Sequence, residues 1–126
     1  MTSKTVWLAA LVSVVILLLG VRAFVDPVAA SASFGLPMHT AAETAFVRVY
    51  GARNAMLGAV ALIFALRGMI RPLVLLFMLA TVLPFLDAVV IVSRVGLGHE
   101  LARHAVIMVV LAALSISLWR LQDARS

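Results

Sequence analysis

Four polar side chains interrupt apolar stretches of this chain: Tyr50, Arg53, Asn54 and Asp87. A guanidinium can hold an oxyanion, a hydroxyl and an amide can orient a bound molecule, and a carboxylate can transfer protons. Inside a membrane such groups need partners, because a charged side chain near the bilayer centre costs about 2.5 kcal/mol or more. What they do therefore depends on the elements that carry them.

The composition indicates an integral membrane protein. The chain has 126 residues, enough for one domain, and is 65% hydrophobic and 12% charged, with a mean hydropathy of +1.21. A soluble domain of this length could not bury so much apolar surface. The net charge of +5 comes from basic residues scattered at the ends of apolar segments, which is typical of membrane topology and not of a nucleic-acid partner. The absence of cysteine excludes disulfides and thiolate metal sites.

Four apolar segments are each long enough to cross a hydrocarbon core of roughly 30 Å. None alternates with a period of two, so all four are predicted to be helices. We expect an all-α, integral membrane four-helix bundle that forms a single transmembrane domain over residues 1–126. The predicted spans are approximately 5–24, 45–66, 72–93 and 101–119.

The connection between the first two spans should contain a short interfacial helix. Asp26 is a helix N-cap residue and Pro27 suits the first helical position, so Val28 to Ser33 is predicted to be helical. Gly35 should end that helix, which would lie in the membrane interface or cover the mouth of the bundle. In the third span, Pro84 should bend the helix and free the carbonyl of the residue four positions earlier.

Arg53 and Asp87 are predicted to form a pair that lines a cavity with Tyr50 and Asn54. Each lies eight residues from the same side of the bundle, at a depth of roughly 12 Å. Pairing removes most of the penalty of placing either charge in the membrane. Such a pair could equally serve only to fix the register of two helices.

Further polar residues outline a funnel from that membrane face. Glu43, His99, Glu100, Arg103 and His104 lie toward the surface. The three histidines show no metal-ligand spacing, so no metal site is predicted. The predicted site consists of catalytic and substrate-binding residues; the catalytic ones are Asp87, Arg53 and Glu43, and the substrate-binding ones are Tyr50, Asn54, His104 and Thr81.

Small residues on the second span predict a close helix contact. Gly51, Ala55 and Ala59 recur every four residues, a spacing that lets a neighbouring helix approach closely. The neighbour could belong to the same chain or to a second copy in a homo-oligomer.

Several short motifs occur together along residues 20–115: Phe34-Gly-Leu-Pro37, Tyr50-Gly-Ala-Arg53-Asn54, Leu83-Pro84-x-x-Asp87 and His104. In this combination the chain resembles a family of small four-helix membrane proteins from bacteria and fungi, described only as a domain of unknown function. The family often has an aspartate directly after the arginine, where this chain has Asn54. The resemblance implies the architecture and the choice of residues, and it implies no chemistry.

Two classes of function follow. One is a protein that binds a small, largely apolar molecule from the lipid bilayer, including a membrane-embedded isomerase or cyclase that uses acid–base groups. Small four-helix membrane enzymes that isomerise epoxides are an analogy of size and architecture alone. The other class is a non-catalytic membrane protein whose Arg–Asp pair serves helix assembly or partner binding. No cofactor is indicated by the sequence.

We predict that both termini are cytoplasmic. The side of the membrane that holds the termini carries Lys4, Arg67, Arg71, Arg120 and Arg125, and more basic residues are expected on the cytoplasmic side. A reporter active only in the cytoplasm, fused to the C-terminus, should be active. Activity only of a reporter that works outside the cytoplasm would reverse the assignment.

Overall fold

A computed structural model describes residues 4–96, 98 and 100–125 of the chain. Within these residues every regular element is a helix and no strand occurs, so the predicted all-α class is confirmed. The helices are α1 (Lys4–Val25), α2 (Pro27–Phe34), α3 (Ala41–Leu66), α4 (Ile70–Ala80), α5 (Val82–Val95) and α6 (Glu100–Arg125).

Four helical segments, α1, α3, α4 with α5, and most of α6, are long and apolar enough to cross a membrane, as expected for the predicted four-helix fold class. Their outward surfaces are apolar as well, with exposed side chains such as Leu11, Leu18, Ile63 and Val109. Because lipid is the solvent for these surfaces, the exposed apolar residues need no protein partner.

The third span is broken between α4 and α5 at Thr81. Pro84 has no N–H group, so it cannot donate to the carbonyl of Ala80, four residues earlier. Thr81 donates both its N–H and its hydroxyl to the carbonyl of Phe77, at 3.0 and 2.8 Å. The predicted bend therefore occurs at the turn from which the proline removes a hydrogen bond.

Helix α2 forms as the sequence predicts. The Asp26 side chain accepts a hydrogen bond from the Ala29 N–H at 3.3 Å, which caps the first turn. Gly35 ends the helix with φ of 106°, a left-handed conformation that glycine adopts without steric cost. The Ser31 hydroxyl then accepts a hydrogen bond from the Met38 N–H at 3.0 Å, so the following loop folds back onto the helix.

Helices α1 and α3 pack at backbone contact, and glycines make this approach possible. A Cβ atom added to Gly51 would lie 2.6 Å from the Gly20 carbonyl oxygen, and one added to Gly20 would collide with the Ala55 N–H. Gly58 is packed equally closely against the backbone of α1. The predicted close contact at Gly51 and Ala55 is confirmed, and the neighbour is α1 of the same chain. A homo-oligomer contact through Gly51, Ala55 and Ala59 would need this already covered face.

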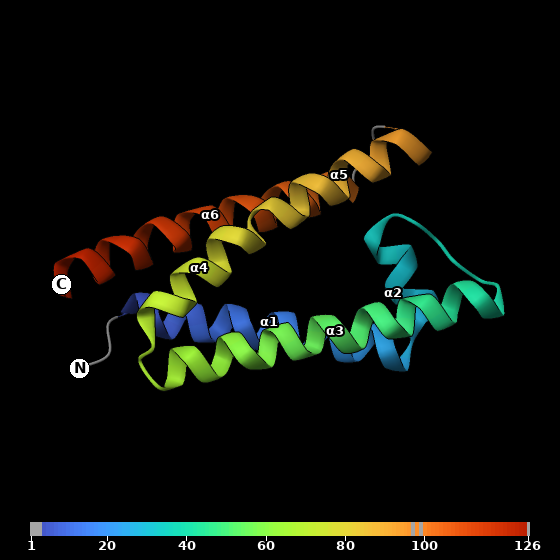
Figure 1. The fold of residues 1–126 in the computed structure, drawn as a ribbon. Helices are drawn as coiled ribbons and strands as arrows, with labels where there is room; N and C mark the ends of the chain where they lie inside the picture. The colour runs from blue at the N-terminus through green and yellow to red at the C-terminus, as the bar shows by residue number, and fades with distance from the viewer. Residues whose placement is uncertain (1–3, 97, 99, 126) are drawn as a thin grey trace.

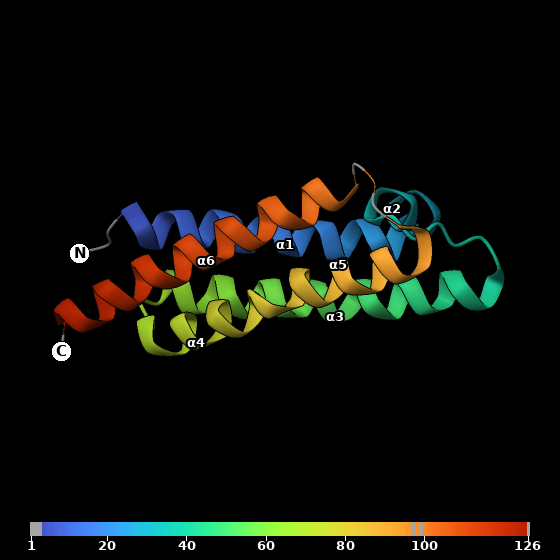
Figure 2. The same cartoon turned by 90° about the horizontal axis from the view of Figure 1, so that it is seen from above.

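The bundle is made of two halves that meet at one end. Helix α1 packs along α3, while α6 packs on α4 and α5 (Figure 1). The start of α1, the α3–α4 turn and the end of α6 lie together at one end, where Trp7 and Trp119 are both exposed (Figures 1 and 2). Toward the other end α5 diverges from α3 (Figure 1). The hydrophobic core joins the two halves nearer the end that holds the termini and includes Ala9, Leu73, Phe77, Leu111 and Leu118.

Replacing Gly51 by leucine should destabilise the protein, because the added side chain would push two backbones apart. Overpacking of this kind typically costs about 1–3 kcal/mol. We expect a lower midpoint of thermal unfolding for purified Gly51→Leu in detergent. The matched control is Ala52→Leu, since Ala52 is the next residue on α3 and is exposed. Equal midpoints for the two variants would contradict the close packing of α1 on α3.

Candidate functional site: a polar cavity between the two halves of the bundle

A cavity of about 590 Å³ lies where the two halves of the bundle diverge. All six helices and the loop after α2 contribute to its walls. Most of the lining is aliphatic or aromatic, and the deep end is formed by residues of the core, including Ala61, Phe77 and Leu111. The polar side chains that line the cavity are Arg22, Ser31, Tyr50, Asn54, Asp87, Arg103 and His104.

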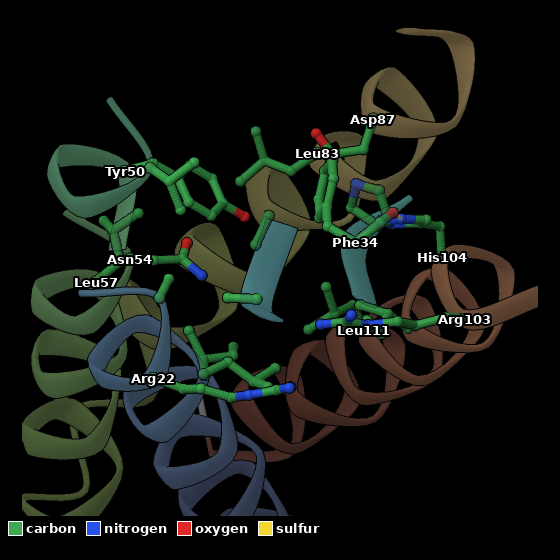
Figure 3. Close-up of a pocket in the computed structure, with 18 of the residues that line it drawn as sticks. Arg22, Phe34, Tyr50, Asn54, Leu57, Leu83, Asp87, Arg103, His104 and Leu111 are labelled. Carbon is green, nitrogen blue, oxygen red and sulfur yellow. Dashed lines mark hydrogen bonds between the residues drawn. The ribbon is translucent and has the colours of Figure 1, made fainter. Parts of the chain in front are cut away.

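The rotation of α3 places Tyr50 and Asn54 in this cavity. Successive residues of a helix are about 100° apart, so Asn54 and Tyr50 lie about 60° and 100° to one side of Gly51. Because Gly51 is held against α1, these two side chains turn toward the space between the bundle halves. Figure 3 shows the Tyr50 ring and the Asn54 amide pointing into the cavity from α3. Tyr50 and Asn54 therefore line the same cavity.

His104 joins α6 to α2. Its side chain is only 3% exposed, and its Nε2 lies 3.0 Å from the carbonyl oxygen of Phe34. A carbonyl only accepts hydrogen bonds, so Nε2 must carry the proton, and in the neutral ring Nδ1 is then a free acceptor. The Phe34 ring packs edge-on against His104 and Tyr50, with centroids 4.7 and 6.1 Å away (Figure 3). These three rings connect α3, α2 and α6 across the cavity.

Asp87 supplies the carboxylate of the cavity. It is half-buried on α5, one turn after Pro84, and it lines the cavity together with Tyr50 and His104. Within the described residues no side chain or backbone group forms an ion pair or hydrogen bond with it. The carboxylate is therefore available to a bound molecule.

The cavity opens sideways between α3 and the α4–α5 segment. These two walls carry apolar side chains that line the cavity and are also exposed on the outer surface: Phe46, Leu57, Leu79 and Leu83. Exposed apolar residues on spanning helices face lipid. The cavity is therefore bordered on this side by apolar side chains that also form part of the outer surface of the bundle.

Arg53 does not belong to this site, which corrects the predicted Arg53–Asp87 pair. Arg53 lies about 160° from Gly51 around α3, beyond the sector that faces the cavity. It is exposed and does not line the cavity. The free-energy cost of placing the Arg53 charge in the membrane is small because Arg53 is close to one end of the bundle. Gly20 packs beside Gly51 and Ala55, and Gly20 is about 7.5 Å from the end of α1, so Arg53 lies at a similar level. From there a long arginine side chain can reach the interface.

Glu43 and Thr81 are also placed outside the cavity, contrary to the prediction. Glu43 is exposed in the first turn of α3, where its carboxylate accepts a hydrogen bond from the Thr40 N–H at 3.1 Å. The Thr40 hydroxyl in turn accepts one from the Glu43 N–H at 3.2 Å, which completes a capping box. The Thr81 hydroxyl is used by the Phe77 carbonyl. His99 lies outside the described residues.

Arg22 and Phe34 are among the lining residues that were not predicted for the site. Arg22 on α1 turns toward the cavity (Figure 3). Its Nη2 donates a hydrogen bond to the Ser33 hydroxyl of α2 at 3.3 Å. Phe34 closes the cavity from α2. The sequence shows Arg22 near the end of an apolar span and Phe34 next to a helix-ending glycine, but neither position reveals which way the side chain points.

Among the described residues, no group of three or more His, Cys, Asp or Glu side chains is arranged to hold a metal ion. The structure thus defines a multi-pass integral membrane protein, a helical bundle with a partly polar cavity between its two halves. The chain belongs to the family described as Domain of unknown function (DUF4267), whose model matches residues 13–118. The resemblance to an uncharacterised family is thereby confirmed. No curated protein and no solved structure matches the chain.

A double-mutant cycle tests the separation of Arg53 from Asp87. Because the two side chains do not meet, Arg53→Met and Asp87→Leu should change the unfolding free energy additively, within about 0.5 kcal/mol. A buried pair would behave differently, since removing one partner typically costs about 3–5 kcal/mol and removing both costs far less. Unfolding of the four proteins in detergent measures the coupling. Recovery of stability in the double variant would contradict the separation and support direct pairing of Arg53 and Asp87.

Proposed function

We propose that the protein binds a small, largely apolar molecule that it takes from the bilayer into the cavity between the bundle halves. The observation that supports this proposal is the lining of the cavity: apolar side chains exposed on the outer surface of the spanning helices border it on one side, and Tyr50, Asn54, Asp87 and His104 line its interior. A volume of about 590 Å³ falls within the range of cavities that enclose small-molecule ligands.

The polar side chains suit the recognition of one functional group on such a molecule. The Asn54 amide and the Tyr50 hydroxyl can each donate and accept hydrogen bonds, and the free Nδ1 of a neutral His104 can accept one. The Phe34 carbonyl fixes the His104 ring, so this acceptor is held in place. Pre-positioned polar groups within apolar walls give a ligand both orientation and affinity.

Acid–base chemistry is a further part of the proposal. Asp87 can take a proton from a bound molecule and return it at another position, as an isomerase or cyclase requires. Tyr50 lies within range of its charge and could hold the reacting oxygen. Arg53 and Glu43 have no part in this version of the site, because they lie outside the cavity.

The non-catalytic alternative also changes. An Arg53–Asp87 pair cannot serve helix assembly when Arg53 points away from the cavity. The contact between α1 and α3 depends instead on glycine packing. What remains of the alternative is binding without conversion, in which the same cavity stores, carries or senses its ligand.

Native mass spectrometry of the protein released from lipid nanodiscs tests binding. We expect a co-purifying small molecule, and we expect its occupancy to fall at least severalfold in Leu83→Trp, because the larger ring would take up part of the cavity and obstruct the ligand. The matched control is Leu86→Trp: both leucines are exposed on α5, but only Leu83 lines the cavity. Equal occupancy in the two variants, or no bound molecule in the wild type, would contradict the proposal.

Asp87→Asn separates catalysis from binding. The amide keeps the shape of the carboxylate but cannot transfer protons as a base, so a catalytic site should retain its ligand and lose conversion. Chromatography of the extracted ligand before and after incubation with each protein measures conversion, including conversion to an isomer of equal mass. Identical chromatograms with wild-type protein and with empty nanodiscs would leave the cavity as a binding site without catalysis.

A further inference from the structure

Two arginines from opposite halves of the bundle turn into the cavity. Figure 3 shows Arg22 extending from α1 and Arg103 from α6 toward the same region, below the rings of Phe34 and Tyr50 in that view. They come from helices far apart in the sequence, and each is near the end of a spanning helix. Arginine at a helix end commonly extends to the interface, so an inward orientation of both is a feature of this site.

The hydrogen-bonding capacity of these two guanidinium groups is largely unused. Arg22 donates to the hydroxyl of Ser33 at 3.3 Å, a neutral partner that uses one of its five N–H groups. No described residue accepts a hydrogen bond from Arg103 or forms an ion pair with it, although its charge acts on the Tyr50 hydroxyl. Both groups can therefore donate to an additional acceptor.

The described lining of the cavity has an excess of positive charge. Arg22 and Arg103 are its two cations, and Asp87 is its one carboxylate. In Figure 3 Asp87 lies at the opposite edge of the cavity from the arginines. The acid thus leaves the two guanidinium groups without a counter-ion.

The apolar part of the cavity extends away from the arginines along the bundle. From Arg103 to Leu111 on α6 there are eight residues, a distance of about 12 Å along the helix axis. Leu111 and Phe77 belong to the buried core at that deep end. A molecule in the cavity therefore has a cationic environment at one end and an apolar environment at the other.

We propose that the ligand is a single-chain amphiphile with an anionic head group, a carboxylate or a phosphate, held by Arg22 and Arg103 while its chain lies toward Phe77 and Leu111. This inference rests on the proposed function and specifies its ligand class. Arginine recognises both kinds of oxyanion through paired N–H groups, and such charge-assisted hydrogen bonds are about twice as strong as neutral ones. Asn54 and Tyr50 then face the part of the ligand's hydrocarbon chain that is next to the head group.

Direct binding to protein in nanodiscs of uncharged phosphatidylcholine tests the inference. The probe is tritiated dodecanoate, and the competitors are dodecyl phosphate, 1-dodecanol and inorganic phosphate. Leu83→Trp defines the background from partition into lipid. We expect dodecanoate and dodecyl phosphate to bind at least about tenfold more tightly than 1-dodecanol, because the alcohol has no charge to pair with the arginines. Inorganic phosphate should not compete, since it lacks the chain.

Variants at the arginines locate the effect. Arg22→Gln and Arg103→Gln should each weaken the binding of the two anionic ligands about tenfold and leave the binding of 1-dodecanol unchanged. Arg103→Lys, which keeps a positive charge, should retain most of the preference and shows that loss in Arg103→Gln is not a folding defect. The control is Arg94→Gln, an exposed arginine at the end of α5 that does not line the cavity.

Two outcomes would overturn the inference. If 1-dodecanol binds as tightly as dodecanoate and Leu83→Trp abolishes both, the cavity binds apolar molecules without regard to charge, and only the proposed function stands. If inorganic phosphate competes as well as dodecyl phosphate, the arginines hold a free anion and no amphiphile. Absence of any saturable binding above the Leu83→Trp background would count against the proposed function itself.

Discussion

Backbone contact between α1 and α3 is the constraint on which the site depends. Gly20 and Gly51 leave no room for a side chain between the two helices, so α3 cannot rotate without a clash. In lipid there is little hydrophobic force between helices, and close packing of small residues supplies much of the attraction. The locked rotation turns Tyr50 and Asn54 inward and Arg53 outward. One structural contact therefore selects which polar residues of α3 can touch a ligand.

The other half of the bundle creates the space that these residues face. The missing proline hydrogen bond breaks the third span at Thr81, and beyond the break α5 diverges from α3 (Figure 1). Helix α6 packs along α5 and places His104 next to α2, where the His104 ring forms a hydrogen bond with the Phe34 carbonyl. A straight third helix would continue parallel to α3 and close the lateral opening. The bend thus gives the bundle a packed end and an open end.

Much of this arrangement can be read from the sequence, because it depends on local rules. Apolar length predicts the spans, Asp26 and Gly35 predict the limits of α2, and Pro84 predicts the break. The error at Arg53 has a clear cause: counting residues from the helix end gives depth, but depth does not give direction around the helix. The small residues Gly51 and Ala55 carried that information, since a side chain about 160° from Gly51 must face away from α1 and past the cavity. The orientation of the Arg22 and Phe34 side chains could not be predicted from the sequence, because it depends on how helices far apart in the sequence pack together.

The polarity of the cavity matches the orientation of molecules within one leaflet of a bilayer. Its arginines lie near helix ends, where lipid head groups lie, and its apolar floor lies deeper, where chains lie. A single-chain amphiphile that moves sideways through the opening between α3 and α5 would keep its head group at the interface and its chain in hydrocarbon. It would not have to turn over or carry its charge across the membrane, a step that is costly for an ion. In the proposed function, a lateral opening and the separation of charge from apolar surface would therefore serve the same route of entry.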